Sequence, residues 1–125
     1  MSTAGESKTV LVVEDNRVER EGTAVVLREK GYRVLLAANG AEAWKHLRGD
    51  PLPDLMLLDM MLPDVDGWQL LAQVRGDPTF ASMPVIIATG LGIANPDWAA
   101  SLGAAGLLRK PFDADRLIQE VERFR

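Results

Sequence analysis

Along the chain, short apolar runs alternate with longer stretches in which apolar residues recur at helical spacing. The short runs are rich in aliphatic and β-branched residues and contain few polar positions. Such near-continuous runs are typical of strands whose two faces are both covered. The pattern predicts five strands, at residues 9–13, 32–37, 54–58, 84–89 and 105–109.

The longer stretches carry helix signals at both ends. Asp66 and Asp113 precede two of them as candidate N-caps, and Gly31 follows the first as a candidate left-handed C-terminal residue. In the first helix, the aliphatic residues that suggest a buried stripe include Val18 and Val25. The predicted helices cover residues 17–30, 41–48, 67–75, 95–102 and 114–124.

Strands that alternate with helices predict a parallel sheet, because each return to the same end of a sheet requires a crossover. We therefore expect an α/β fold, a three-layer sandwich with helices on both faces of the sheet. Residues 1–8 are small and polar and are expected to form a flexible leader, whereas residues 9–125 are expected to form one domain. Ligands of such sheets bind beyond the carboxyl ends of the strands.

Composition narrows the function classes. The chain has a net charge of −4 and no visible cluster of Lys and Arg, so direct nucleic-acid binding is not expected. It contains no cysteine, which excludes disulfides and thiolate metal sites. No apolar run approaches the roughly 18 residues that span a bilayer, and the first residues lack the core of a secretion signal. A cytoplasmic protein without membrane contact is expected.

Polar side chains stand at the carboxyl ends of four predicted strands. Glu14 and Asp15 follow the first strand, Asp59 follows the third, Thr89 ends the fourth and Lys110 follows the fifth. Carboxylates gathered at one edge repel each other, so they either take up protons or hold a cation. Because only oxygen ligands are present, a hard ion such as Mg²⁺ is favoured. The set predicts a metal-assisted site for a phosphoryl group.

Asp59 is the natural nucleophile of this predicted site, because a carboxylate can form an aspartyl phosphate. Lys110 offers a compact positive charge, and Thr89 offers a hydroxyl that can donate to a phosphoryl oxygen. The apolar third strand then serves as a rigid support for one reactive carboxylate.

Four segments carry a family resemblance: "LVVEDN", "LLDMMLPDVDG", "VIIATG" and "LLRKPF". In this order and spacing they resemble the signature blocks of the response-regulator receiver domain of two-component signalling, including its chemotaxis-regulator-like members. The resemblance covers residues 9–124. It implies a flavodoxin-like, doubly wound fold, with a five-stranded parallel sheet in the order 2-1-3-4-5 and five helices.

The resemblance also assigns roles. Asp59 is implied as the phosphoacceptor, which receives its phosphoryl group from a histidine of a sensor kinase or a histidine phosphotransfer protein. Asp15, Asp59 and the main-chain carbonyl of Met61 are implied as direct Mg²⁺ ligands, with Glu14 acting through water. Such a protein is not an enzyme in the usual sense, because it catalyses only its own phosphorylation and dephosphorylation.

For signal output, the resemblance implies that Lys110 pairs with the phosphoryl group and that Thr89 moves toward it. A cis Lys110–Pro111 peptide bond is implied as well. The output face is expected near the last helices and strand, where a downstream protein or domain, or a second copy in a homodimer, would bind. Leu107 stands where the family usually has an aromatic switch residue.

Other function classes fit the sequence less well. A phosphatase of the haloacid dehalogenase type needs a second acid two residues after the nucleophile, and Met61 occupies that position. A nucleotide or flavin binder is suggested only by "GLGIAN" from Gly90, which lacks a third glycine and follows the wrong strand. A receiver-like protein-binding module that works without phosphorylation remains the main alternative.

Several residues are interpreted as structural. Asp64 and Asp66 are expected to be turn and cap residues, and His46 is expected to be a solvated surface residue. Trp44 and Trp98 are expected to pack at least partly against the core.

Overall fold

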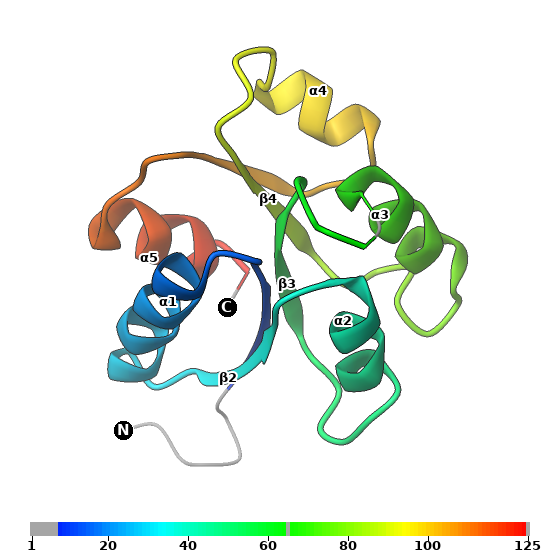
Figure 1. The fold of residues 1–125 in the computed structure, drawn as a ribbon, viewed down its shortest axis with the longest axis horizontal. Helices are drawn as coiled ribbons and strands as arrows, with labels where there is room; N and C mark the ends of the chain where they lie inside the picture. Colours follow the sequence, from blue (N-terminus) through cyan, green and yellow to red (C-terminus); the bar gives the residue numbers. More distant parts are fainter. Residues whose placement is uncertain (1–7, 65, 125) are drawn as a thin grey trace.

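The computed structural model describes residues 8–64 and 66–124. Within them, five parallel strands form one sheet in the order β2-β1-β3-β4-β5 (Figure 1). The predicted sheet and its strand order are therefore confirmed. The strands are β1 (Thr9–Val13), β2 (Arg33–Ala37), β3 (Leu55–Asp59), β4 (Val85–Thr89) and β5 (Gly106–Arg109).

Helices connect the strands, as the alternating pattern predicted. Asn16, Asn39, Asp66, Asn95 and Asp113 each accept a hydrogen bond at a helix N-terminus, so the caps expected at Asp66 and Asp113 are confirmed. The helices are α1 (Arg17–Glu29), α2 (Gly40–Leu47), α3 (Gly67–Gly76), α4 (Pro96–Ser101) and α5 (Ala114–Glu122). Among the described residues, none of these helices is long and apolar enough to cross a lipid bilayer.

The sheet lies between two helical layers. Figure 1 shows α1 and α5 on one side of the sheet and α2 and α3 on the other. Apolar side chains divide accordingly, because successive residues of a strand point to opposite faces. Leu11 and Leu58 pack in the core under α2, α3 and α4, whereas Val12 and Leu57 pack in the core under α1 and α5. Both faces of β1, β3 and β4 are thus buried, which explains their continuous apolar sequences.

The predicted stripe of α1 is wrong at two positions. Val18 is 81% exposed and Val25 is 54% exposed, whereas Thr23, Ala24 and Leu27 form the buried face. At about 100° per residue, Val18 and Val25 lie on the opposite side of the helix from Leu27. Thr23 and Ala24 have short side chains, and their burial is harder to predict from a sequence than that of a set of valines.

Two pairs of aromatic rings pack against each other in the layer formed by α2, α3 and α4. The rings of Trp68 on α3 and Trp98 on α4 meet edge to face, with their centroids 5.9 Å apart. Trp44 meets Phe80 in the same manner at 6.4 Å. Trp44 and Trp98 are both partly buried against the core, as the sequence predicted.

Arg75, near the end of α3, joins two loops to that helix. Its guanidinium donates hydrogen bonds to the main-chain carbonyls of Phe80 at 2.9 Å, Met83 at 2.6 Å and Gly103 at 2.8 Å. Burial lowers the pKa of Arg75 from its ordinary value. The planar fork of donors matches several fixed carbonyls at once, which a lysine could not do.

Candidate functional site

Two buried acids meet at the carboxyl edge of the sheet. Glu14 directly follows β1, and Asp59 is the last residue of β3. Because Val13 and Leu58 are register partners in these neighbouring strands, the residues that follow them emerge side by side. Glu14 and Asp59 are each only 6% exposed, and Asp15 beside them is exposed. Oxygens of these three carboxylates lie within 4.8 Å of one another.

The loop after β1 is held in place by its own hydrogen bonds. The main-chain N–H of Asn16 donates to Glu14 Oε2 at 3.1 Å, and Asn16 in turn caps α1 by accepting from the N–H of Glu19. Arg20 Nη1 reaches back from α1 to the carbonyl of Glu14 at 2.9 Å. The acidic loop is therefore fixed by the first turns of α1.

The turn after β3 is held by hydrogen bonds and by close packing. The N–H of Met61 donates to Asp59 Oδ1 at 3.1 Å, and the N–H of Gly67 donates to the carbonyl of Met60 at 2.8 Å. A Cβ atom at Gly67 would lie 2.5 Å from Met60 Cα, which is closer than such atoms approach in proteins. Gly67 therefore allows the start of α3 to pack against the residue that follows Asp59.

Lys110 extends into the acidic edge from the end of β5. Its Nζ lies 2.5 Å from Glu14 Oε1, 2.8 Å from Glu19 Oε1 and 3.6 Å from Asp59 Oδ2. The Lys110–Pro111 peptide bond is cis, as the family resemblance implied. The ammonium thus contacts three carboxylates, of which Asp59 is the most distant.

Thr89 ends β4, the strand between β3 and β5. It is 1% exposed, and its Oγ1 accepts a hydrogen bond from the N–H of Leu91 at 3.1 Å. Its carbonyl accepts from the N–H of Lys110 at 2.9 Å, which links the ends of β4 and β5. All five predicted polar residues are therefore found at one edge of the sheet.

Burial and charge shift the proton affinities of two groups. The pKa of Glu14 is raised from 4.5 to about 7 in total, mainly by burial. Hydrogen bonds from Lys110 and Asn16 oppose this rise, and nearby Asp59 contributes to it. Burial alone would lower the pKa of Lys110. Its hydrogen bonds to Glu14 and Glu19 and the charge of Asp59 outweigh burial and raise that pKa above its ordinary value.

The raised pKa of Glu14 predicts a pH dependence of stability in metal-free protein. Between pH 4.5 and about 7, folded Glu14 holds a proton that the unfolded chain has lost. The stabilisation from this proton is full below pH 4.5 and is lost as the pH rises through about 7. Thermal unfolding in chelator should therefore show a melting temperature that falls with pH across this window for wild type, relative to Glu14→Gln. Equal slopes for the two proteins would contradict the assignment.

Sequence reasoning missed Glu19. It lies in the first turn of α1, where an acid is ordinarily explained by the helix dipole, and nothing in the sequence indicates that it contacts Lys110, which lies far along the chain. His46 also differs from its prediction, because it is partly buried and its Nε2 lies 2.9 Å from the carbonyl of Leu36. Asp64 accepts from the N–H groups of Gly40 and Ala41 at the start of α2, a contact with a distant helix that was not predicted from its place in a turn.

Comparisons with known proteins agree with this architecture. A family model described as the response regulator receiver domain matches residues 10–122. The response regulator Rre1 of Synechocystis sp. is 39% identical over 111 residues, which are 87% of this chain and 48% of that protein. A putative response regulator from Chloroflexus aurantiacus J-10-fl has a solved structure with a TM-score of 0.87 and 33% identity, and the match covers 95% of this chain and 98% of that one.

A second solved structure among the matches contains a metal ion. The receiver domain of sensor histidine kinase PA1611 from Pseudomonas aeruginosa PAO1 has a magnesium ion coordinated in its active site cleft. It matches with a TM-score of 0.82 and 29% identity over 94% of this chain and 97% of that one.

The fold and the matches are those of a receiver module of two-component signalling. The chain belongs to the response regulator receiver domain family. Receiver domains of this family pair with sensor kinases and with output domains. The chain spans about half the length of the first curated relatives it matches, at 48%, 54% and 46% of their lengths.

Proposed function

We propose that the chain is a phosphorylation-activated receiver in which Asp59 accepts a phosphoryl group from a phosphohistidine. The observation that carries this proposal is the convergence at one sheet edge of a buried Asp59, a second buried acid at Glu14 and the ammonium of Lys110. A buried acid pair with one adjacent cation suits transient binding of a further cation and an anion better than it suits stability alone.

The residues present fit Mg²⁺. Three carboxylates, two of them buried, offer only hard oxygen donors within 4.8 Å of one another. We propose that Asp15, Asp59 and the carbonyl of Met61 hold the ion and that Glu14 holds it through water. When bound, the ion supplies positive charge that offsets the charge of the transferring phosphoryl group.

The chain's own residues supply the remaining steps. An Asp59 carboxylate oxygen forms a bond to phosphorus while the bond between phosphorus and the donor histidine nitrogen breaks. The nitrogen keeps the electron pair and later takes a proton from water. Lys110 Nζ, 3.6 Å from Asp59 Oδ2, stabilises negative charge on the transferring group. Thr89, whose Oγ1 accepts from the N–H of Leu91, then donates a hydrogen bond from its hydroxyl to the new phosphoryl group.

Metal removal tests this proposal. Incubation with acetyl phosphate or phosphoramidate in the presence of Mg²⁺ should add one phosphoryl group, as measured by intact mass. Excess chelator should abolish the gain, because three carboxylates at one edge would then face the anionic donor without a compensating cation. No gain with any donor in Mg²⁺ would instead support a protein-binding module that works without phosphorylation.

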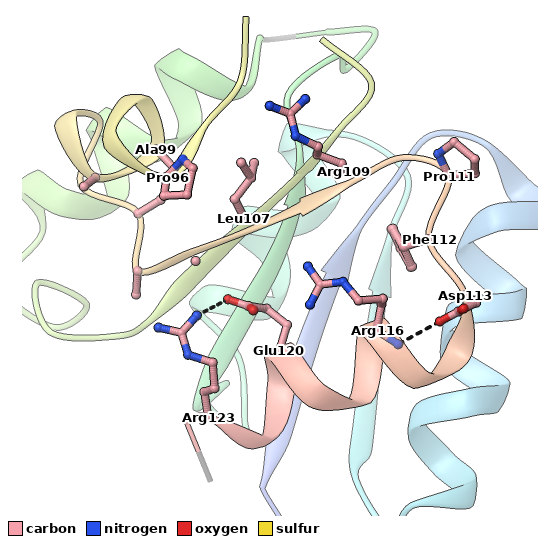
Figure 2. A pocket seen from close by; sticks show the side chains of 14 residues that line it. Pro96, Ala99, Leu107, Arg109, Pro111, Phe112, Asp113, Arg116, Glu120 and Arg123 are labelled. Carbon is pink, nitrogen blue, oxygen red and sulfur yellow. Dashed lines mark hydrogen bonds and ion pairs between the residues drawn. The ribbon is translucent and has the colours of Figure 1, made fainter. Parts of the chain in front are cut away.

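We propose that the output surface is a groove between α4 and α5 that passes over β5, with a volume of about 560 Å³. Figure 2 shows Leu107 within this groove, with Arg109 beyond it, Arg116 on α5 and the Glu120–Arg123 ion pair at the end of that helix. Leu107, which replaces the family's usual aromatic residue, is only partly buried there. A downstream protein, an output domain or a second copy of the chain would read changes in this groove.

Phosphorylation is expected to change this groove measurably. Thr89 pairs with Arg109 across β4 and β5, so movement of Thr89 should alter the β5 backbone next to Leu107. Adding the phosphoryl mimic beryllofluoride with Mg²⁺ should shift the amide resonances of Leu107 and Arg109, as measured by NMR. The resonances of Val26 and Ile118, which lie between α1 and α5, should move much less and serve as the internal control. Shifts confined to the acidic edge would contradict this output route.

The remaining partner predictions are part of this proposal. We propose a cytoplasmic protein that receives its phosphoryl group from a sensor histidine kinase or a histidine phosphotransfer protein, and that does not itself bind nucleic acid. One relative is named as a DNA-binding dual master transcriptional regulator, RpaA of Synechocystis sp., and the match covers 46% of its length. Titration of fluorescent duplex DNA with this chain would test whether the chain binds nucleic acid.

A further inference from the structure

We infer that Glu19 is a positioning residue that holds Lys110 away from Asp59 and thereby slows phosphorylation. This inference rests on the proposed phosphoryl transfer to Asp59 and adds a regulatory residue to it. The observation behind it is the position of the ammonium, which lies 2.8 Å from Glu19 Oε1 but 3.6 Å from Asp59 Oδ2.

The geometry gives Glu19 a role that the buried acids do not have. Glu14 belongs to the cluster of carboxylates that can share a cation, together with Asp15 and Asp59. Glu19 lies outside that cluster, in the first turn of α1, and its side chain is 49% exposed. A cation in the cluster would compete with Lys110 for Glu14 and Asp59 but would leave the Glu19 carboxylate free to keep its hold on Lys110.

Lys110 must therefore leave Glu19, or share its charge with it, when it turns toward the phosphoryl group. In the transfer step, Asp59 bonds to phosphorus, the bond from phosphorus to the donor breaks, and the leaving group keeps the electron pair. Negative charge on the transferring oxygens then attracts Lys110. Glu19 competes for the same ammonium, so part of the transition-state stabilisation is lost.

The main-chain role of Glu19 is separate from this effect. Its N–H is capped by Asn16 Oδ1 at 2.9 Å, and a side-chain substitution leaves that bond intact. Glu19→Gln should therefore preserve the start of α1 while removing the charge that holds Lys110. For a partly exposed ion pair, the phosphorylation rate should rise by about two- to fivefold.

The experiment measures phosphorylation rates with acetyl phosphate and saturating Mg²⁺ by intact mass for wild type and three variants. Glu21→Gln is the matched control, because Glu21 lies on the same helix but pairs with exposed Arg17 at 3.0 Å instead of Lys110. Glu19→Asp retains the charge but shortens the side chain by one methylene, which withdraws the carboxylate from Lys110. Thermal unfolding of each variant checks that the fold is unchanged.

Each outcome decides the inference. Faster phosphorylation of both Glu19→Gln and Glu19→Asp, with Glu21→Gln like wild type, supports it. If Glu19→Asp behaves as wild type, or if Glu21→Gln matches Glu19→Gln, the effect is only repulsion of the anionic donor and the inference is overturned. Unchanged rates for both Glu19 variants also overturn it while leaving the proposed function intact. If wild type gains no phosphoryl group, the proposed function fails, and this inference fails with it.

Discussion

Asp59→Asn is expected to abolish phosphoryl uptake, with a rate at least about 100-fold below wild type. The asparagine amide keeps the size of Asp59 and can still accept the hydrogen bond from Met61, but it has no anionic oxygen to attack phosphorus. It also removes one of the carboxylates available to a cation. Intact mass after incubation with acetyl phosphate and Mg²⁺ measures the effect.

Asp66→Asn is the matched control for that substitution. Asp66 precedes α3 in the loop that follows β3, and its side chain accepts a hydrogen bond from the N–H of Gln69 at 2.8 Å. Asparagine caps a helix about as well as aspartate, so the control removes one acid without disturbing the loop. It should gain a phosphoryl group at the wild-type rate. Equal uptake by Asp59→Asn and wild type would exclude Asp59 as the acceptor.

Gly67→Ala is expected to have the largest effect on stability, a loss of about 1–3 kcal/mol in the free energy of unfolding. The added Cβ would lie 2.5 Å from Met60 Cα and 2.8 Å from Met60 Sδ. Main-chain atoms cannot move aside as a side-chain end can, so α3 must shift away from β3. Because Met60 directly follows Asp59, the variant should also take up phosphoryl groups more slowly. Chemical denaturation measures the first effect and intact mass the second.

Gly22→Ala, at a glycine in another helix, is expected to have the opposite effect on stability. Gly22 lies inside α1, and apart from its two chain neighbours and the nearby backbone of its own helix, no atom lies within 4 Å of the position that its Cβ would take. Alanine should therefore stabilise the protein by about 0.5–1 kcal/mol, because it restricts the unfolded chain and favours the helix. Destabilisation by both alanine substitutions to the same extent would show that the close approach of Gly67 to Met60 is not the cause.

Most of the fold was predictable from the sequence because its signals are local. Continuous apolar runs identified β1, β3 and β4, and cap residues such as Asp66 and Asp113 marked helix starts that the structure confirms. The orientation of α1 was not predictable from its valines. It depends on which side of the helix packs against the rest of the molecule, where Ala24 is buried and Val25 is exposed.

The candidate site was predictable as a set of strand-end residues, and the structure places that set at one edge. The sequence did not show which charged side chains of the site pair with one another. Glu19 contacts Lys110 only because α1 turns its first residues toward the end of β5, a contact between residues distant in the chain. Arg75 was missed for the same reason, since its acceptors are carbonyls of loops whose paths no local pattern specifies.

The edge-to-face pair of Trp68 and Trp98 gives the molecule an optical consequence. The two indoles belong to different helices and lie 5.9 Å apart, a separation at which their excited states couple. Trp44, the third tryptophan, pairs with Phe80 instead and supplies a separate background signal. Near-ultraviolet circular dichroism should therefore follow any displacement of α4 relative to α3 without an added label. The unmodified chain carries its own spectroscopic reporter beside the groove.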